Sequence, residues 1–367
     1  MNENKPDTDP IASIPPLTRA SGRSSVHWVG VGLAVVGLGI FLSAATTVLG
    51  LFGIGGNQIE HANVAFDLKP DGSGIVFSSA NGGLFTYDFL TKKATELNRS
   101  KEILTAPKYS PDGKSIVYVA WNPTDRRGEI CEEPAAGGKA VRLTHGSGTS
   151  DSEPAFSPDG KQIVFIRAAR YRAYSMGGMV WDDFDICLLD VASGNVTTLT
   201  HEKYYSASSP TFTDGGRAIV YSASAHGESA QTSAFSISVG SGSVPTAIMP
   251  RTGSSQQIGS WVSDIASLSD GNRLVFISDR AEPFAYDIYT SDSNGKNPKA
   301  LGFTSISHYN RAPIFAKDGK SIYVLAGTES NAHSRPIFSF YQVDLSGRAT
   351  PICDSGLFTD PLAWRPK

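Results

Sequence analysis

The feature that most constrains how this chain folds is a short turn-and-strand pattern that occurs six times. Its clearest copy spans residues 156–165, with the sequence Phe-Ser-Pro-Asp-Gly-Lys-Gln-Ile-Val-Phe. Pro and Asp favour a tight turn, Gly supplies the positive φ that closes it, and the Ile-Val-Phe triplet has the composition of a strand. The Asp of the turn recurs at Asp71, Asp112, Asp159, Asp214, Asp270 and Asp318. Six copies in one register indicate a structural repeat.

The spacing of these copies predicts a β-propeller. Successive Asp positions lie 41, 47, 55, 56 and 48 residues apart by subtraction, and one four-stranded blade takes roughly 40–50 residues. A second pair of strands follows the hairpin, as in Ile186–Asp190 and Val196–Leu199 around a Ser-Gly-Asn turn. We therefore expect an all-β fold, a six-bladed β-propeller of four-stranded antiparallel blades. A β-sandwich with coincidental turns is the alternative, and six copies in register argue against it.

The C-terminal segment resembles the start of another blade. Residues 358–366, Phe-Thr-Asp-Pro-Leu-Ala-Trp-Arg-Pro, have the pattern of a first strand that stops where its turn would begin. A propeller must join its first and last blades or leave an exposed sheet edge. We expect this segment to add a strand to another blade, with a seven-bladed ring as the alternative.

The repeat resembles that of the TolB-like β-propellers, which are relatives of WD-repeat proteins. Residues 110–114 and 157–161, both Ser-Pro-Asp-Gly-Lys, match its signature, and residues 286–289, Tyr-Asp-Ile-Tyr, match its third strand. The resemblance covers roughly residues 63–366 and implies the propeller fold. Such propellers serve as scaffolds, lyases and accessory domains of peptidases, so the fold alone does not imply a function. TolB itself carries an additional α/β domain, where this chain has a different N-terminal segment.

That N-terminal segment has the composition of a membrane anchor. Residues 28–54 contain no charged residue, and about 20 apolar residues in a helix cross the ~30 Å hydrocarbon core. A helix buried in a globular domain and a signal peptide cleaved near Ser43-Ala44-Ala45 are the alternatives. The apolar run continues past that site to Ile54, which favours an uncleaved anchor. The predicted order is a disordered cytoplasmic segment at residues 1–25, a transmembrane helix at 26–55, a tether at 56–62 and the β-propeller at 63–367.

The charges beside the apolar run predict its orientation. Arg19 and Arg23 precede it and Glu60 follows it, and positive residues near a span favour the cytoplasmic side. We expect a single-pass protein of the cytoplasmic (inner) membrane, with its N-terminus in the cytoplasm and its propeller on the periplasmic or extracellular side.

Charge and cysteine content exclude some classes of function. The formal net charge is −3 and no run of Lys or Arg occurs, which argues against a nucleic-acid partner. Cys131, Cys187 and Cys353 form no CxxC pair. We expect buried thiols, with a disulfide between Cys131 and Cys187 as the alternative.

The loops divide into two sets that lie on opposite faces of a propeller. The Asp-Gly turns and the turns between third and fourth strands form one face, here called the Asp-Gly-turn face. The second-to-third loops and the links between blades form the other, the long-loop face, which is richer in Arg, aromatic residues and His. We expect binding on the long-loop face, by Arg167, Arg170, Tyr171, Arg172, Tyr174, Trp181, Asp182, Tyr204, Tyr205, Arg280, His308, Tyr309 and Arg311.

The insertion between Arg167 and Asp183 is the most unusual part of this face. Arg recognises carboxylate or phosphate through two parallel hydrogen bonds, and aromatic rings offer stacking surfaces. Acidic peptides, sugars or envelope polymers would suit that mixture. The alternative is that these arginines pair with Asp182, Asp183 and Asp185 and simply fix the loop.

No cofactor and no metal ion is predicted. The candidate metal ligands, His201 and His308, lie on links that enter different blades and would have to converge near the axis. The leading interpretation is a non-catalytic, membrane-anchored propeller that binds a partner protein or a carbohydrate. The alternative is a metal-dependent polysaccharide lyase or another hydrolase that uses the same face. The sequence gives no indication of the oligomeric state.

The anchor interpretation predicts the topology of the protein in the cell. A reporter fused to the C-terminus is expected to be active only outside the cytoplasm, because residues 26–55 hold the propeller there, and the mature protein is expected to keep residues 1–25. Reporter activity and N-terminal sequencing measure both. Recovery of a soluble product that begins near Ala45 would contradict an uncleaved anchor.

Overall fold

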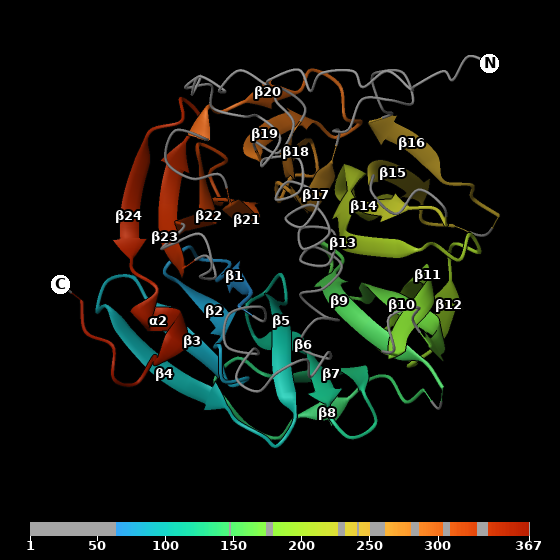
Figure 1. Ribbon diagram of the computed structural model, residues 1–367, viewed down its shortest axis with the longest axis horizontal. Coiled ribbons are helices and arrows are strands. Elements are labelled where there is room, and N and C mark those ends of the chain that lie inside the picture. Colours follow the sequence, from blue (N-terminus) through green and yellow to red (C-terminus); the bar gives the residue numbers. More distant parts are fainter. Residues whose placement is uncertain are drawn as a thin grey trace, which may run out of the picture.

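The computed structural model describes residues 64–146, 148–173, 179–226, 232–240, 242–249, 261–279, 286–303, 309–328 and 337–366. Its strands form six four-stranded antiparallel sheets, each made of four consecutive strands. Figure 1 shows these sheets arranged around a central axis, with the first strand of each innermost and the fourth outermost. The predicted six-bladed propeller is therefore confirmed.

The first three blades have the following strands. Blade 1 consists of β1 (Phe66–Leu68), β2 (Gly74–Ser78), β3 (Leu84–Asp88) and β4 (Lys93–Asn98). Blade 2 consists of β5 (Ile103–Tyr109), β6 (Ser115–Asn122), β7 (Arg127–Pro134) and β8 (Val141–Arg142). Blade 3 consists of β9 (Ser150–Phe156), β10 (Gln162–Ala173), β11 (Met179–Asp190) and β12 (Val196–Thr198).

The other three blades complete the ring. Blade 4 consists of β13 (Ser206–Thr213), β14 (Ala218–Ser224), β15 (Ser233–Ser238) and β16 (Thr246–Met249), with the short 3-10 helix η2 (Asp214–Gly216) in its first turn. Blade 5 consists of β17 (Val262–Ser267), β18 (Arg273–Ser278), β19 (Asp287–Asp292) and β20 (Lys299–Ala300). Blade 6 consists of β21 (Tyr309–Phe315), β22 (Ser321–Thr328), β23 (Ile337–Asp344) and β24 (Ala349–Cys353), and the short helix α2 (Gly356–Thr359) follows it.

The apolar triplets after the Asp-Gly turns are buried because each sheet is covered on both faces. In β2, Ile75, Val76 and Phe77 are at most 1% exposed. Side chains alternate across a strand, and here Ile75 and Phe77 pack toward blade 6 whereas Val76 packs toward blade 2. One such cluster of buried apolar side chains lies between each pair of neighbouring blades. The hydrophobic core is therefore divided among the six blade interfaces.

Each Asp-Gly turn is held by its own side chains. In blade 2, Asp112 Oδ1 accepts hydrogen bonds from Ser110 Oγ (2.7 Å) and from the Lys114 backbone N–H (3.0 Å). Ser110 Oγ also accepts from the Ser115 N–H at 2.9 Å. Gly113 has φ of 72°, which a residue with a Cβ rarely adopts. The Ser-Pro-Asp-Gly-Lys sequence thus carries its own turn geometry, which explains its regular recurrence.

The prediction that the C-terminal segment adds a strand to another blade is wrong. Every sheet already has four strands, and the C-terminal segment instead forms helix α2 and turns. The Asp360 N–H donates to the Gly356 carbonyl and the Trp364 N–H donates to the Asp360 carbonyl, both at 2.9 Å. These local bonds satisfy backbone groups that an added strand would have paired with a neighbour, and Pro361 has no N–H to give to a ladder.

The C-terminal segment nevertheless closes the ring, through its side chains. Leu357 and Phe358 are 0% and 2% exposed. The Phe358 ring lies 5.1 Å from that of Phe77 in blade 1 and 6.2 Å from that of Phe340 in blade 6. The Phe358 carbonyl accepts a hydrogen bond from the Ala80 N–H at 2.9 Å. Helix α2 therefore seals the junction between the last and first blades. In Figure 1 this helix lies beside β2 and β3.

Two further expectations concern the cysteines and the anchor. Cys131, Cys187 and Cys353 are buried free thiols, so the disulfide alternative is wrong. The predicted anchor at residues 26–55 lies outside the residues that the structure describes. Within the described ranges, no helix has the length and apolar character needed to span a bilayer.

The closure by side chains predicts how the tail contributes to stability. Phe358→Ala is expected to lower the free energy of unfolding by roughly 3–5 kcal/mol, because it leaves a cavity in a close-packed junction. Leu362→Ala, at a side chain that is 52% exposed, is the matched control and is expected to change it by less than about 0.5 kcal/mol. Denaturant unfolding of both variants measures this, and equal effects would show that the tail does not seal the ring.

Candidate functional site

A cavity of about 590 Å³ lies on the axis of the propeller. The first strands of all six blades line it, from β1 to β21. Its wall continues to the Asp-Gly turns, where Pro70, Pro111 and Pro158 contribute to it. The axial cavity therefore reaches the Asp-Gly-turn face, whereas the sequence led us to expect binding on the long-loop face.

Charged side chains project into this cavity from five of the six blades. They are Asp67, Lys108, Glu153, Asp264 and Arg311, and Lys69 and Lys317 join them toward the Asp-Gly turns. Lys108 Nζ lies 3.4 Å from Asp67 Oδ1. With all seven groups ionised, three carboxylates face four cations, so the cavity is polar and carries charges of both signs.

A local irregularity of the inner strands accompanies these carboxylates. Glu153 and Asp264 have positive φ angles of 50° and 49°. Their counterparts in the other blades, Ala106, Ser209 and Ala312, also have positive φ, between 48° and 55°. The pairing register shifts at each of these points. Such β-bulges leave a backbone group of the inner strand outside its ladder.

The carboxylates of alternate blades satisfy backbone N–H groups of the next blade. Glu153 of blade 3 accepts a hydrogen bond from the Ser209 N–H of blade 4. Asp264 of blade 5 accepts one from the Ala312 N–H of blade 6. In blade 1, Asp67 Oδ2 accepts from the Tyr109 N–H of blade 2 at 2.9 Å. These side chains therefore join blades in pairs around the axis as well as lining the cavity.

Burial changes the acidity of these groups. Desolvation raises the pKa of the Glu153 carboxyl to about 7, although the Ser209 N–H opposes the shift. Desolvation likewise raises the pKa of Asp67 and of Asp264, against the opposing effects of Lys108 and Arg311 respectively. It lowers the pKa of Arg311, which the two nearby carboxylates partly restore. A carboxyl that titrates near neutrality in a concave site is typical of a binding or catalytic position.

A second candidate lies on the long-loop face, where β10 and β11 extend as a two-stranded ribbon. Both strands are 12 residues long, and β10 pairs with β9 only as far as Ala168. The ribbon is braced from blade 2, because Trp181 Nε1 donates to the Arg126 carbonyl and an Arg126 guanidinium N–H donates to the Tyr171 hydroxyl at 3.2 Å. The Tyr171 and Trp181 rings lie 5.0 Å apart.

The arginines of this ribbon pair with acidic side chains of the same blade. Arg167 makes two hydrogen bonds to buried Asp151, at 2.7 and 2.8 Å. Arg170 lies 3.0 Å from both Asp182 and Asp183, and Arg172 also pairs with Asp182. These contacts agree with the alternative in which the arginines pair with acidic residues and fix the hairpin. The partner of Arg167 is Asp151, whereas Asp185 was expected among the partners.

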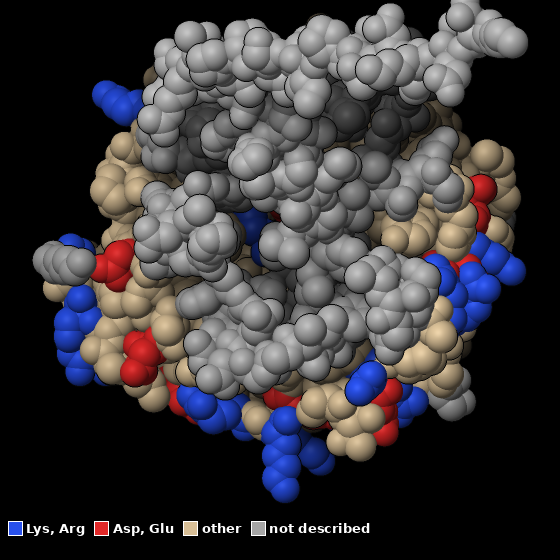
Figure 2. Space-filling model, viewed as in Figure 1, with Lys and Arg blue, Asp and Glu red and all other residues tan. Residues whose placement is uncertain are grey.

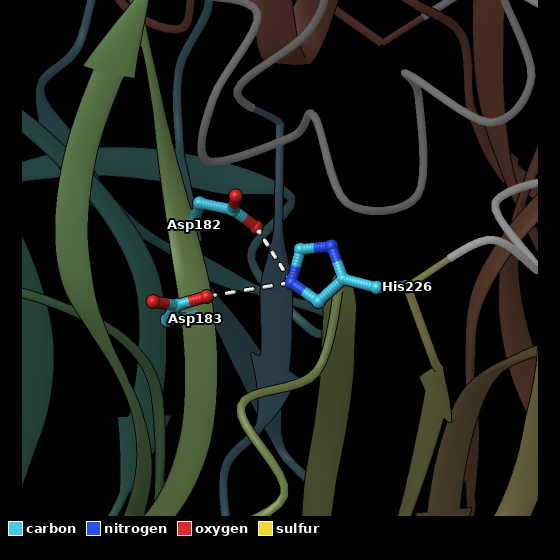
Figure 3. Close-up of side chains that lie close together, drawn as sticks. All are labelled: Asp182, Asp183 and His226. Carbon is cyan, nitrogen blue, oxygen red and sulfur yellow. Dashed lines mark ion pairs between the residues drawn. The ribbon is translucent and has the colours of Figure 1, made fainter.

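Asp182, Asp183 and His226 converge between blades 3 and 4 (Figure 3). His226 Nε2 lies 3.4 Å from Asp182 Oδ1 and 3.3 Å from Asp183 Oδ1. Neighbouring side chains on a regular strand point to opposite sides. Asp183 has φ of 57°, and this left-handed conformation accompanies the approach of both carboxylates to one imidazole.

The remaining expected site residues lie in several places. Tyr204 is 5% exposed and its hydroxyl bonds that of Tyr221 at 2.9 Å, so it belongs to the core. The Tyr205 ring lies 5.7 Å from that of His226. His201 is exposed on the link between blades 3 and 4, and Arg311 lines the axial cavity. Tyr174, Arg280, His308 and the side chain of Tyr309 lie outside the described residues.

Sequence reasoning missed the acidic groups of the axial cavity. Glu153 and Asp264 each stand six residues before the Asp of an Asp-Gly turn, as do Ala106 and Ala312 in other blades. Aligning the repeats on these turns shows that one inward position carries acids in only two copies. This variation at a repeated position could have identified Glu153 and Asp264 as candidate site residues.

The pKa of Glu153 predicts a pH dependence of stability. Its pKa is about 7 in the folded protein against an ordinary 4.5, so the folded state binds more protons between these values, and the contribution of this group to stability falls as the pH rises from about 4.5 through 7. The loss is roughly 3 kcal/mol at most. Glu153→Gln is expected to remove this part of the pH dependence, because an amide does not titrate but still accepts from Ser209.

Urea unfolding at pH 5, 6, 7 and 8 measures this difference. Glu202→Gln, at an exposed side chain on the link between blades 3 and 4, is the matched control and should keep the wild-type pH dependence. Parallel curves for the wild type and Glu153→Gln would contradict the raised pKa.

Several known proteins share this architecture. TolB from Acinetobacter baumannii has a TM-score of 0.55 and 18% identity, over 79% of this chain and 63% of that one. An oligogalacturonate lyase from Vibrio parahaemolyticus has a TM-score of 0.54 and 11% identity, over 78% and 76%. A chain of a nidogen/laminin complex has a TM-score of 0.54 and 10% identity, over 76% and 91%. At these identities the likeness shows the fold alone.

The sequence comparison is more specific. No curated protein matches the chain. Residues 56–265, which are 210 of the 367 residues by subtraction, match the TolB beta propeller domain. The Ser-Pro-Asp-Gly-Lys turns and the six four-stranded blades agree with that match. The chain therefore belongs to the TolB β-propeller family.

Proposed function

We propose that this chain is a non-catalytic binding protein that takes a segment of a partner protein into its axial cavity. The TolB-like propeller fold supports a binding or scaffold role in general. The proposal further places the propeller outside the cytoplasm, held to the inner membrane by residues 26–55. That part rests on the uncharged sequence of the anchor and on the arginines before it.

The axial cavity is the observation that carries this proposal. It is concave, all six blades build it, and its groups with shifted pKa values converge there. A pocket with a few convergent polar groups is the usual position of a ligand. The inner strands are fixed by their neighbours, so the charges in the cavity are held in place before a partner arrives, which lowers the entropic cost of binding.

The lining favours a protein segment over a carbohydrate. Sugars stack on exposed aromatic faces, whereas none of the described aromatic side chains beside the cavity is fully exposed. Phe66, Tyr109, Phe212 and Phe315 are at most 8% exposed, and Phe156 and Tyr323 are half-buried. Charges of both signs suit a peptide that carries charged side chains or a chain terminus. On the face shown in Figure 2, Lys and Arg are interspersed with Asp and Glu among the coloured residues.

The long-loop face is a second candidate for the docking of a protein or carbohydrate. The braced ribbon of β10 and β11 favours it, because contacts from blades 2 and 4 hold the ribbon in place. Its arginines already have acidic partners, so a ligand there would contact mainly the ribbon's outer surface. Recognition of an acidic ligand by Arg167, Arg170 and Arg172 would require these ion pairs to open.

An enzyme in the axial cavity is the alternative function, and one observation favours it. A carboxyl with a pKa of about 7, such as Glu153, suits a general acid or base. The lyase among the similar structures gives oligogalacturonate as a first substrate to test. Turnover that Glu153→Gln abolishes would replace the binding proposal with this one.

Site-specific photo-crosslinking in the full-length protein tests the binding proposal. A photo-crosslinker at Lys317, an exposed residue at the mouth of the cavity, is expected to give a discrete protein adduct in intact cells. The matched control is Lys114, which is exposed on the same face but does not line the cavity. Thr211→Trp, which fills the cavity, is expected to reduce the adduct at Lys317 at least tenfold while the melting temperature stays within a few degrees. Equal adducts at both lysines, or an adduct that survives the filled cavity, would overturn it.

A further inference from the structure

We propose that Asp182, Asp183 and His226 form a binding site for a divalent transition-metal ion, with Zn²⁺ as its best probe. The site lies apart from the axial cavity and ties the ribbon of blade 3 to blade 4. His226 lies two residues after the end of β14, and the two carboxylates come from β11. The proposal does not depend on the function proposed for the cavity.

Two of the three distances between the donor atoms already match those of metal ligands, and all three atoms lie within 4.8 Å of one another. His226 Nε2 is 3.4 Å from Asp182 Oδ1 and 3.3 Å from Asp183 Oδ1. Tetrahedral zinc with bonds of about 2.0–2.1 Å to nitrogen and oxygen places its ligand atoms about 3.3–3.4 Å apart. One imidazole and two carboxylates suit a first-row divalent ion. A water molecule would complete the four-coordinate shell.

The two aspartates face the histidine because of the backbone at Asp183. With φ of 57° it departs from the strand conformation, and Figure 3 shows both carboxylates directed at one nitrogen of His226. Asp182 has 2% of its side chain exposed and His226 has 43%. The site thus combines a fixed, buried ligand with an open side from which an ion can enter.

Two arginines share these carboxylates and decide how an ion binds. Both Arg170 and Arg172 bond Asp182 through Oδ2, which leaves Oδ1 directed toward His226. Arg170 also bonds Asp183, at Oδ1 and Oδ2. With both arginines in place a divalent ion would leave two excess positive charges, and with Arg170 displaced it would leave one.

Arg170 is the arginine that gives way to the ion. Its side chain is 51% exposed, against 33% for Arg172, so its guanidinium regains water at less cost than that of Arg172 when it leaves the carboxylates. Arg172 then remains on Asp182 Oδ2 and orients that carboxylate, as groups around a metal commonly do. Removing Arg170 should therefore strengthen metal binding, which an adventitious surface histidine would not show.

The experiment uses the full-length protein, purified in detergent, freed of metal with a chelator and titrated with Zn²⁺ by calorimetry. The wild type is expected to bind one Zn²⁺ ion at this site and to melt at a higher temperature when it is bound. His226→Ala and Asp183→Asn are expected to weaken binding at least tenfold. Arg170→Ala is expected to strengthen it severalfold.

His201→Ala is the matched control, because His201 is exposed on the neighbouring link outside the cluster, and it should leave binding unchanged. Absence of Zn²⁺ binding in the wild type, or equal binding by His226→Ala, would overturn the site. An affinity that Arg170→Ala does not raise would overturn the exchange of arginine for metal. Thermal unfolding of each metal-free variant checks that the fold is retained.

Discussion

Apolar contact between neighbouring blades is the interaction on which this structure depends. Each sheet is only four strands wide and is covered on both faces, so it cannot bury its apolar residues without its neighbours. In a closed ring the last blade also packs against the first, so this junction must be sealed like the others. Here the side chains of Leu357 and Phe358 seal the junction, in place of the added strand that the sequence predicted.

The same packing explains why the axis became a site. Apolar side chains occupy the interfaces between blades, and the innermost strands turn polar groups into the space that remains. The bulges at Glu153 and Asp264 bring carboxylates to backbone N–H groups of the next blade. These acids therefore hold the ring together and also give the cavity its charge, which links closure of the fold to the chemistry of the proposed binding site.

Much of the fold could be predicted from the sequence, and much of the site could not. The Asp-Gly turns and apolar triplets are local signals, and the strands expected at Ile186–Asp190 and Val196–Leu199 correspond to the end of β11 and to β12. The prediction for the C-terminal segment was wrong because its local pattern is that of a strand. Whether a sheet still has room for another strand depends on the whole ring, and local pattern does not show it. Arg167 was expected to meet a ligand, but its partner Asp151 lies on a neighbouring strand that periodicity does not identify.

The central claim is that a partner occupies the axis of the propeller. Electron cryo-microscopy of the full-length protein with its crosslinked partner tests this most directly. We expect density for a partner segment inside the cavity, beside Glu153, Asp264 and Arg311. Density confined to the long-loop face, with the axial cavity unchanged, would contradict it.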